Sequence, residues 1–319
     1  MINVTAMSGM PNERIAVIVP CLNEEATIGR VLTDFAATLP DAQLVVVDNN
    51  CTDRTAQIAR DRGVLVLRET RPGKGHAMRK AFREIDADIY VMVDGDDTYP
   101  ASDVLQMLPP IRQGAADVVV GARLGVKSAS DFHWVNRFGN NILLRTLNLV
   151  FRSDVTDLLS GYRVMSREFV KQAPVLSAGF ELETELSILA FERGFRTLEV
   201  PVTLRARTAG SSSKIHIVRD GVRILSTILA LLRDYRPMSF FGSAGVICIL
   251  VALGPGVFVT VEFLKLGTVR IPTAVLATGM VLSGLLLVLV GIILTALSRR
   301  FRELDHRLNL IADQSRPKL

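Results

Sequence analysis

Two long apolar stretches in the last third of the chain restrict most strongly what it can fold into. The first covers residues 240–261 and the second covers residues 271–297. Each exceeds the roughly 20 residues that an α-helix needs to cross a bilayer. A helix buried in a soluble core explains them poorly, because only residues 262–270 separate the two stretches. The sequence therefore predicts two transmembrane helices that anchor a water-facing domain.

Basic residues flank the outer ends of this anchor, at Arg233, Arg236, Arg299, Arg300 and Arg302. The segment between the two apolar stretches carries Lys265 and Arg270. Cytoplasmic loops of membrane proteins are enriched in lysine and arginine. This distribution therefore predicts an integral protein of the cytoplasmic (inner) membrane, with the N-terminal domain and the C-terminus both in the cytoplasm.

Between the domain and the anchor, apolar residues recur at helical spacing, at Val218, Val222, Leu225, Leu229 and Leu232. A core helix would show the same pattern. The arginines and the apolar stretch that follow favour an interfacial helix that lies on the bilayer. The predicted organisation is a domain over residues 1–213, an amphipathic helix over 214–237, the anchor over 238–298 and a cytoplasmic tail over 299–319.

Composition excludes several classes of protein. The net charge of +5 is modest, and no aromatic-rich basic stripe is present, so a membrane surface or anionic substrates are better partners than nucleic acid. The spacing of Cys21, Cys51 and Cys248 fits neither a zinc site nor a disulfide framework, which favours a reducing compartment. Residues 1–14 lack the apolar core of a cleavable signal peptide.

The N-terminal domain alternates buried strands with helices. The predicted strands are Ile15–Pro20, Leu44–Val47, Val64–Leu67, Ile89–Val93 and Val118–Val120. Helical spacing follows the first strand, where Ile28, Val31, Leu32 and Phe35 recur. Such alternation is typical of a doubly wound, mostly parallel α/β sheet of the Rossmann-like kind.

The fourth predicted strand is followed by three carboxylates in four positions, Asp94, Asp96 and Asp97. Asp94 and Asp96 are two residues apart, so extended backbone points both the same way, and Gly95 lets a ligand approach closely. A divalent cation would relieve their repulsion, and Mg²⁺ favours one or two carboxylates with phosphate oxygens and water. An isolated motif of this kind is more often an acidic surface turn.

Two other strands also end near acidic residues. Asp48 ends the second predicted strand, and Glu24 follows the first. Each aspartate alone could simply cap a turn. Because the carboxyl ends of parallel strands share one edge of the sheet, their combination predicts a crevice for a sugar nucleotide there.

Four segments, Val19–Glu25, Val47–Asp53, Gly73–Gly75 and Asp94–Asp96, resemble the inverting glycosyltransferases of family 2, which have a GT-A fold. Leu159–Arg163, Gly210–Lys214 and the paired apolar stretches narrow the resemblance to the polyprenyl-phosphate glycosyltransferases. That group contains dolichyl-phosphate mannose synthase and bacterial polyprenyl-phosphate hexosyltransferases. The resemblance spans roughly residues 14–300 of the chain.

The resemblance implies a pocket for the nucleotide base and ribose, lined by Pro20, Leu22, Glu24, Asp48 and Asn49. Asp94 would face the ribose and the metal, and Asp96 would be the principal ligand of Mg²⁺ or Mn²⁺. Mannose synthases have a glutamine where this chain has Thr98, so Thr98, Asp97 or a water completes the ligand shell.

Basic residues are expected to meet the phosphates. Arg123 and Arg137 match family arginines that approach phosphates, although either could be a solvated helix charge. Lys74 lies between two glycines in a turn that could cradle a phosphate or be purely structural. The family pattern also places Arg207, Ser213 and Lys214 on donor and lipid phosphates, in a Gly-Ser loop that could close over the donor as a lid.

The acceptor side is expected to involve Ser160 and one glutamate of a predicted helix. Family members carry an acidic residue at the position of Glu185. On a helix, Glu181 shares a face with Glu185 and Glu183 does not. Glu185 is therefore predicted to be catalytic, together with Asp94, Asp96, Arg123 and Arg137. The other two glutamates are assigned to a charged helix surface.

The resemblance implies transfer of a hexose-type sugar from a nucleoside diphosphate sugar to a polyprenyl monophosphate, for synthesis of a cell-envelope glycan. The acceptor oxygen is already an anion at neutral pH, so it needs positioning and charge compensation more than a general base. Residues 94–100 resemble relatives that use uridine donors more than those that use GDP-mannose. A homo-oligomer is compatible with the sequence.

Two alternatives stay open at this point. A family 2 transferase with a neutral lipid or glycan acceptor would need a true general base, such as Asp97 or Glu185. The second alternative is a non-catalytic, membrane-anchored subunit that binds nucleotide sugars or partner membrane proteins. Donor turnover by the purified protein separates this second alternative from an enzyme.

Overall fold

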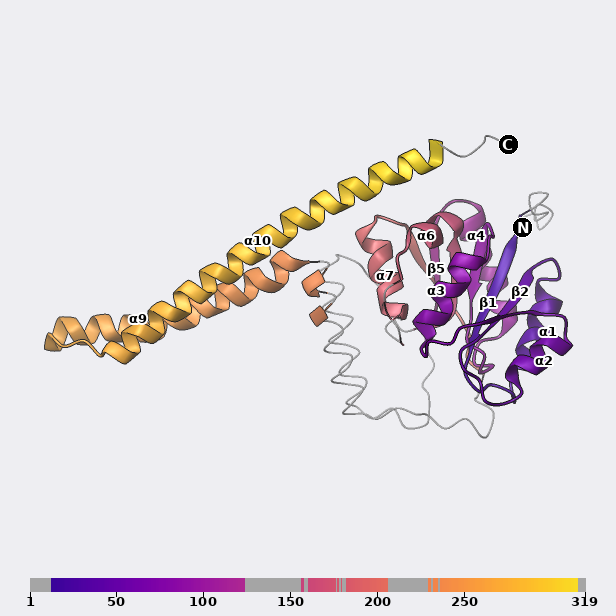
Figure 1. Ribbon diagram of the computed structural model, residues 1–319, viewed down its shortest axis with the longest axis horizontal. Helices are drawn as coiled ribbons and strands as arrows, with labels where there is room; N and C mark the ends of the chain where they lie inside the picture. The colour runs from indigo at the N-terminus through magenta and orange to yellow at the C-terminus, as the bar shows by residue number, and fades with distance from the viewer. Residues whose placement is uncertain are drawn as a thin grey trace, which may run out of the picture. The chain divides into compact units, whose positions relative to one another are not determined.

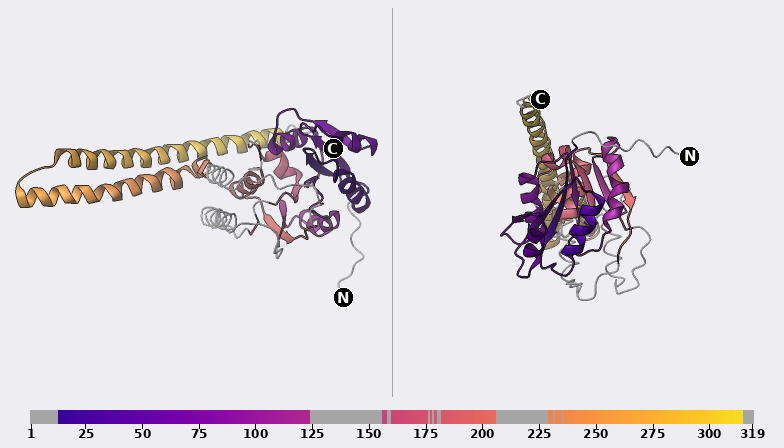
Figure 2. Two further views of the ribbon diagram at one scale, coloured as in Figure 1. Left: turned by 90° about the horizontal axis from the view of Figure 1, so that it is seen from below. Right: turned by 90° about the vertical axis from the view of Figure 1, so that its right-hand side faces the viewer.

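A computed structural model describes residues 13–314, except residues 124–155, 158–159, 176, 178, 180–181, 206–228, 231 and 235. The chain divides into two compact units, residues 1–221 and 222–319 (Figures 1 and 2). Each unit has its own architecture. Most of the amphipathic helix predicted over residues 214–237 lies outside the described residues.

The first unit is built on a seven-stranded sheet with the order β3-β2-β1-β4-β6-β5-β7. Its strands are β1 Ile15–Cys21, β2 Gln43–Asp48, β3 Leu65–Arg68, β4 Ile89–Met92, β5 Val118–Ala122, β6 Arg163–Ser166 and β7 Thr197–Pro201. β6 runs antiparallel to its neighbours β4 and β5, and the other neighbouring strands pair in parallel. The prediction of a mostly parallel α/β sheet is confirmed.

Helices cover both faces of this sheet. They are α1 Ile28–Thr38, α2 Thr55–Asp61, α3 Lys74–Glu84, the short 3₁₀ helix η1 Ala101–Asp103, α4 Val104–Arg112, α6 Arg167–Gln172 and α7 Leu182–Glu192. α1 buries the four apolar residues whose spacing predicted it. Alternate residues of β1 join α1 and α4 in one core cluster, whereas α3 contacts β1 and β2 outside that cluster. Figure 1 shows α1 and α3 on opposite sides of the sheet.

The second unit is an antiparallel hairpin of two long helices that lie side by side (Figure 2). A π-helical turn, η2 Met238–Gly242, leads into α9 Ser243–Leu266, which ends at Gly267 in the left-handed conformation (φ 68°). α10 covers Ile271–Gln314. By length and composition two helical segments could cross a membrane, Met238–Leu266 and Ile271–Phe301, with mean hydropathy 2.4 and 2.8.

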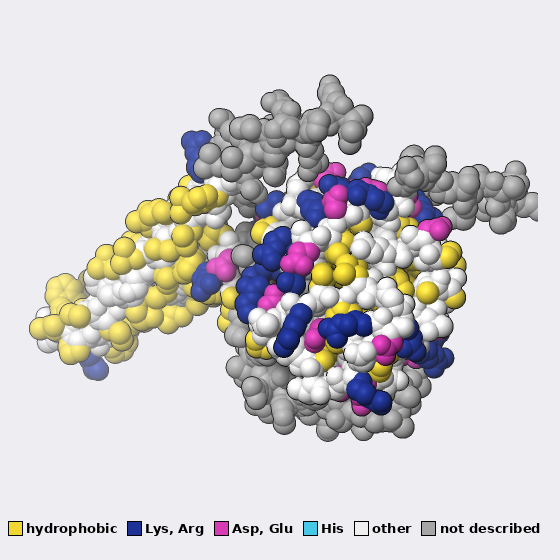
Figure 3. All heavy atoms as spheres, turned by 45° about the vertical axis from the view of Figure 1, so that its right-hand side comes forward, with side chains coloured by type: hydrophobic (Ala, Val, Ile, Leu, Met, Phe, Trp, Pro, Cys, Tyr) yellow, Lys and Arg dark blue, Asp and Glu magenta, His cyan; other side chains and the backbone are white. Residues whose placement is uncertain are grey.

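The surface of the hairpin distinguishes it from a helix pair in a soluble core. Only 11% of the most apolar window of each helix is buried. Figure 3 shows hydrophobic side chains over the visible face of the hairpin, whereas charged side chains are scattered over the first unit. The hairpin thus has the solvation pattern expected of a membrane anchor.

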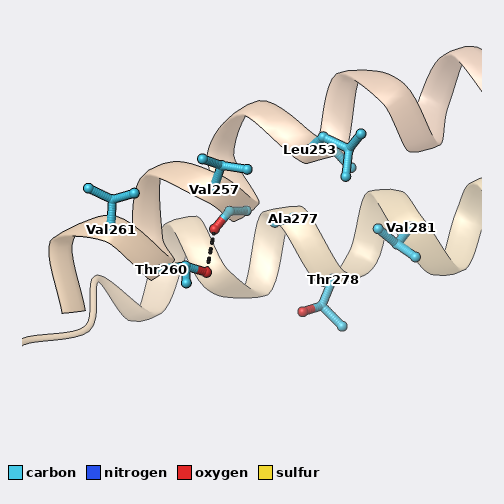
Figure 4. A pocket seen from close by; sticks show the side chains of 9 residues that line it. Leu253, Val257, Thr260, Val261, Ala277, Thr278 and Val281 are labelled. Atoms are coloured by element: carbon cyan, nitrogen blue, oxygen red, sulfur yellow. Dashed lines mark hydrogen bonds between the residues drawn. The ribbon is translucent and has the colours of Figure 1, made fainter. Parts of the chain in front are cut away.

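A groove of about 470 Å³ lies between α9 and α10 (Figure 4). Its lining is apolar apart from two threonines, and it consists of Ala252, Leu253, Gly256, Val257, Thr260, Val261, Ala277, Thr278 and Val281. The Thr260 hydroxyl donates to the backbone carbonyl of Gly256 at 2.9 Å. This groove offers no ionisable group for chemistry, so the candidate site lies in the first unit.

Candidate active site

The register of the strands brings three carboxyl ends to one edge of the sheet. Cys21 at the end of β1 pairs with Asp48 at the end of β2, and β4 lies on the other side of β1. The Cys21 thiol lies at this edge, and its pKa is affected by the nearby acidic groups. Burial raises its pKa well above the usual value, and the charges of Cys51, Glu24, Asp94 and Asp48 raise it further. The acidic residues predicted to share an edge therefore act electrostatically on one buried thiol.

On the β2 side of this edge, polar side chains brace the loops. Asp48 is buried, and its carboxylate accepts the backbone N–H of Cys51 at 2.8 Å. The Asn49 side chain donates to the carbonyl of Arg71 at 2.7 Å and accepts the N–H of Gly73 at 2.7 Å. Both residues thus hold the loops after β2 and β3 in place. Their predicted contact with a nucleotide stays a prediction.

The end of β1 presents an apolar surface next to these polar groups. Leu22 is 51% exposed, which is unusual for a leucine beside a buried strand. Pro20 and Glu24 are half-buried, and the N–H of Glu24 donates to the Thr55 hydroxyl at 2.8 Å. The edge therefore combines an open apolar side chain with nearby carboxylates, which suits a base and a ribose.

Asp94 follows β4 and is held by a lysine. The Lys74 ammonium, at the start of α3, lies 2.5 Å from Asp94 Oδ1 and 2.5 Å from Glu183 Oε1 of α7. Burial lowers the pKa of Lys74, but the charges of the two carboxylates outweigh burial and the pKa rises. Lys74 is therefore a charged bridge between the sheet edge and α7.

Glycines leave room for the acidic loop. A Cβ atom at Gly161 would collide with the Asp94 carboxylate, and a Cβ atom at Gly95 would lie 2.9 Å from the Cys21 sulfur. The carbonyl of Gly95 accepts the Thr27 hydroxyl at 2.6 Å, just before α1. Gly95 thus allows the loop to pack against β1 and α1, whereas its predicted role is close approach of a ligand.

Asp96 and Thr98 continue the acidic loop. Asp96 Oδ1 accepts the N–H of Thr98 at 3.1 Å. The Thr98 hydroxyl oxygen is buried and has no hydrogen-bond partner within the described chain. Two carboxylates and an unpartnered hydroxyl are hard oxygen donors, which fit Mg²⁺ or Mn²⁺. Across the described ranges no three His, Cys, Asp or Glu side chains converge, so substrate oxygens and water would complete the shell.

Asp97 has a different role from its two neighbours. It is buried with a left-handed backbone (φ 57°), and its carboxylate forms ion pairs with Arg30 at 3.3 Å and Arg205 at 2.6 Å. Arg205 also pairs with Asp34 at 2.7 Å, and its N–H donates to the carbonyl of Thr98. Both oxygens of Asp97 are thus engaged, whereas the Thr98 hydroxyl has no hydrogen-bond partner within the described chain.

Arg123 forms a forked ion pair. Its guanidinium donates to Asp157 Oδ2 at 2.6 Å and to Oδ1 at 2.7 Å, and this contact raises the pKa of Arg123. The backbone N–H groups of Thr156 and Asp157 in turn donate to Glu199 of β7. The fork expected to bind a phosphate therefore binds a carboxylate, and a phosphate contact by Arg123 stays a prediction.

The acceptor-side residues lie deeper than expected. Ser160 is fully buried and its hydroxyl contacts that of Tyr99 at 3.4 Å. Glu185 is 2% exposed and accepts the N–H of Ser177 at 2.9 Å. The assignment of Glu183 to a charged helix surface is wrong, because Glu183 is 4% exposed and paired with Lys74. The predicted residues Arg137, Arg207, Ser213 and Lys214 lie outside the described residues.

The sequence contained an indication that Glu183 is buried. Residues 182–190 of α7 are all buried, and apolar residues occur on every side of this helix. A helix without a polar face is an interior helix, so each of its charged residues must have a partner. The partner, Lys74, lies more than a hundred positions away, and local spacing does not reveal it.

Several known proteins are similar to this chain in sequence and in fold. Residues 16–173 match the model of glycosyl transferase family 2. Glycosyltransferase AglJ of Haloferax volcanii is 32% identical over 282 residues, which cover 88% of this chain and 92% of that protein. A dolichyl-phosphate hexose transferase of the same organism is 32% identical over 223 residues, covering 70% of this chain and 95% of that protein.

A solved structure extends the comparison. Glucosyl-3-phosphoglycerate synthase from Mycobacterium tuberculosis, in complex with Mn²⁺, UDP and glucosyl-3-phosphoglycerate, is similar with a TM-score of 0.58 and 26% identity. The similarity covers 69% of this chain and 79% of that one. The GT-A fold expected from the sequence is thereby confirmed.

Proposed function

Because this chain belongs to glycosyl transferase family 2, we propose that it transfers a hexose from a nucleoside diphosphate sugar to a polyprenyl monophosphate at the cytoplasmic face of a membrane. The observation that carries the proposal is the union, in one chain, of a GT-A unit and two apolar helices that could span a bilayer. One relative, similar over 70% of this chain, is a dolichyl-phosphate hexose transferase. A lipid-linked phosphate is therefore the acceptor that best explains the whole chain.

A uridine donor and a divalent cation are supported by the similar solved structure, which holds UDP and Mn²⁺. In this chain Asp94, Asp96 and the Thr98 hydroxyl would hold the cation. When bound, the cation supplies Lewis-acid stabilisation of the departing diphosphate. Leu22 and Asp48 would contact the base and the ribose, in keeping with the exposed apolar side chain and carboxylate at that edge.

The transfer itself needs few proton movements. An oxygen of the acceptor phosphate attacks the anomeric carbon, and the bond from that carbon to the donor's β-phosphate oxygen breaks with inversion. The acceptor oxygen is an anion at neutral pH, so the protein has to orient it and offset charge rather than remove a proton. Lys74 lies 2.5 Å from Asp94 and offsets part of the negative charge of that carboxylate.

The geometry disfavours the alternative with a neutral acceptor. That reaction needs a general base, and Asp97 and Glu185 are the candidates named by the sequence. Asp97 is paired with two arginines, and Glu185 accepts the backbone N–H of Ser177. Each of the two candidate bases therefore already has a partner within the first unit.

The test is to incubate the purified full-length protein with Mn²⁺, a short polyprenyl phosphate and a panel of UDP-hexoses and GDP-mannose. Mass spectrometry of the lipid fraction then identifies the product. We expect a hexosyl phosphoprenol with one UDP-sugar. Turnover of donor without sugar on the prenyl phosphate would overturn the acceptor, and no turnover of any donor would support a binding subunit.

Asp96→Asn provides the matching variant. We expect its transfer rate to fall by more than about 100-fold, because losing even an outer partner of a metal ligand costs 10–100-fold. Asp41→Asn is the control, since Asp41 is exposed just before β2, at the opposite edge of the sheet. Equal rates for the two variants would refute the cation site.

A further inference from the structure

Lys74 joins two acidic side chains from distant parts of the chain. Its ammonium has 2.5 Å contacts to Asp94 Oδ1 and to Glu183 Oε1. The side chains of Lys74 and Glu183 are 12% and 5% exposed, whereas that of Asp94 is 32% exposed. Lys74 and Glu183 therefore lie behind Asp94, on the side away from solvent. An ammonium has three donors, and two of them are used here.

Asp94 is confined on its other side as well. Its Oδ2 atom lies against the bare Cα of Gly161, where any larger residue would collide with the carboxylate. One oxygen is thus fixed by a charged hydrogen bond and the other by a close contact. The orientation of this carboxylate is set by its surroundings rather than by its own loop alone.

Glu183 is held in turn by the framework of the sheet. It lies in the first turn of α7, where the Ser187 hydroxyl donates to its backbone carbonyl at 3.1 Å. Arg163 donates to that hydroxyl at 2.9 Å and is completely buried in β6. In the sheet Arg163 pairs with Met92, two residues before Asp94. The contacts form a closed circuit from β4 through β6, α7 and Lys74 back to Asp94.

From this geometry we propose that Glu183 is a positioning residue for the divalent cation. Glu183 holds Lys74, and Lys74 holds the Asp94 carboxylate in the orientation in which its open side takes the ion. Partners behind metal ligands commonly contribute 10–100-fold in metal affinity or activity. The inference rests on the proposed cation site of Asp94 and is independent of which acceptor the enzyme uses.

Mn²⁺ binding tests the proposal without any turnover. Free Mn²⁺ is followed by its electron paramagnetic resonance signal while the ion is titrated into full-length protein with saturating UDP. We expect Glu183→Gln to raise the apparent Kd about tenfold or more, and Glu183→Asp to raise it less because it keeps the charge. An unchanged Kd in Glu183→Gln overturns the proposal.

Asp103→Asn is the matched control for loss of a buried carboxylate. Asp103 is 8% exposed and accepts the N–H and the hydroxyl of Thr203 at 2.8 and 2.9 Å. It has no place in the circuit, so its substitution should leave the Mn²⁺ Kd unchanged. If Asp103→Asn lost as much Mn²⁺ affinity as Glu183→Gln, removal of any buried carboxylate would have this effect. That result would overturn the positioning role.

A double-mutant cycle separates positioning from a long-range charge effect. If Glu183 acts through Lys74, Glu183→Gln lowers Mn²⁺ affinity in the native background and hardly at all in Lys74→Met. The double variant leaves no unpaired charge between the two positions, which protects its folding. The same loss in both backgrounds would show that Glu183 acts only through its charge and would overturn the proposal.

Asp94→Asn separates this inference from the proposed cation site. If Asp94→Asn leaves Mn²⁺ binding intact, the cation site itself is wrong. If Asp94→Asn abolishes binding while Glu183→Gln does not weaken it, the cation site stands and only the positioning role of Glu183 fails.

Discussion

The sheet-based unit keeps its apolar side chains inside and pairs its charges, whereas the hairpin of α9 and α10 turns its apolar side chains outward. In the first unit, buried carboxylates such as Asp97, Glu69 and Glu183 each contact an arginine or a lysine. In the hairpin, leucines and valines are largely exposed, and glycines lie between the helices. Each unit thus has the kind of surface that suits a different medium.

This difference teaches which contacts hold each unit together. In water, burial of apolar area stabilises the folded state, whereas burial of an unpaired charge destabilises it. The first unit can therefore bury charges only where they have partners. Lipid is as apolar as leucine, so helices in a bilayer associate by close packing of small residues instead. A Cβ atom at Gly245 would lie 2.5 Å from the carbonyl oxygen of Gly284, which shows how closely α9 and α10 approach.

Gly161→Ala should break the first unit's site most severely. The added methyl group collides with the Asp94 carboxylate, so Asp94 must leave the orientation set by Lys74. Displacement of a reacting or binding group by about 1 Å can cost about 100-fold in rate. We expect a loss of that size in sugar transfer, measured at saturating donor.

Gly29→Ala is the control for Gly161→Ala. Its added methyl group would meet the flexible end of the Arg62 side chain, which can move away. Transfer should stay close to the native rate. Comparable losses in the two alanine variants would contradict the importance of the space beside Asp94.

Gly245→Val should destabilise the hairpin and leave the sheet-based unit unchanged. Overpacking a close contact typically costs 1–3 kcal/mol, and we expect about 2 kcal/mol here. Gly254→Val is the control, because nothing lies within 4 Å of a Cβ atom at Gly254. Thermal unfolding in detergent measures the difference, and UDP binding should be unchanged in both variants. Equal stability of the two would show that close packing does not hold the hairpin.

Substitution of Asp97 tests the paired charges of the first unit, with a smaller expected loss of stability. Asp97→Asn keeps a residue that tolerates the left-handed backbone but loses the ion pairs with Arg30 and Arg205. We expect a loss of about 1 kcal/mol in the free energy of unfolding. Asp97→Ala should lose about 1 kcal/mol more, because alanine is strained at positive φ. Identical urea denaturation curves for native protein and Asp97→Asn would refute the pairing.

The smallest effect is expected for Glu69. The Arg71 guanidinium donates to its carboxylate and holds its pKa at about 2, below the usual 4.5. A lowered pKa stabilises the folded state above the unfolded value, and this stabilisation is lost as the pH falls from about 4.5 towards 2. The difference in urea midpoint between native protein and Glu69→Gln should therefore shrink from pH 6 to pH 3. A constant difference would contradict the shift.

Local patterns predicted the backbone of the first five strands and the helices between them. Runs such as Ile15–Pro20 and Val118–Val120 form strands because they are apolar on both faces, and β1 and β5 contain them. β6 and β7 were not predicted. β6 begins with the buried Arg163, and β7 is a short stretch that includes a glutamate and ends in a proline, so neither is an apolar run like the first five strands.

Side-chain partners were much harder to predict than elements. The sequence left Thr98, Asp97 or a water to complete the metal shell, and only the tertiary structure shows that Asp97 is paired with Arg30 and Arg205. Glu183 and Glu185 are two residues apart on one buried helix, and only the position of Lys74 tells them apart. The forked contact of Arg123 with Asp157 likewise joins segments more than thirty residues apart.

By itself the sequence determined the membrane-type hairpin, the mostly parallel sheet and the edge at which its acidic residues gather. These follow from periodicity and hydropathy, which act over neighbouring residues. Only the tertiary structure decided that Lys74 lies between Asp94 and Glu183 and that Asp97 is paired with two arginines. The physical reason is that a charge, unlike an apolar face, is satisfied by one or two partners that can come from anywhere in the chain.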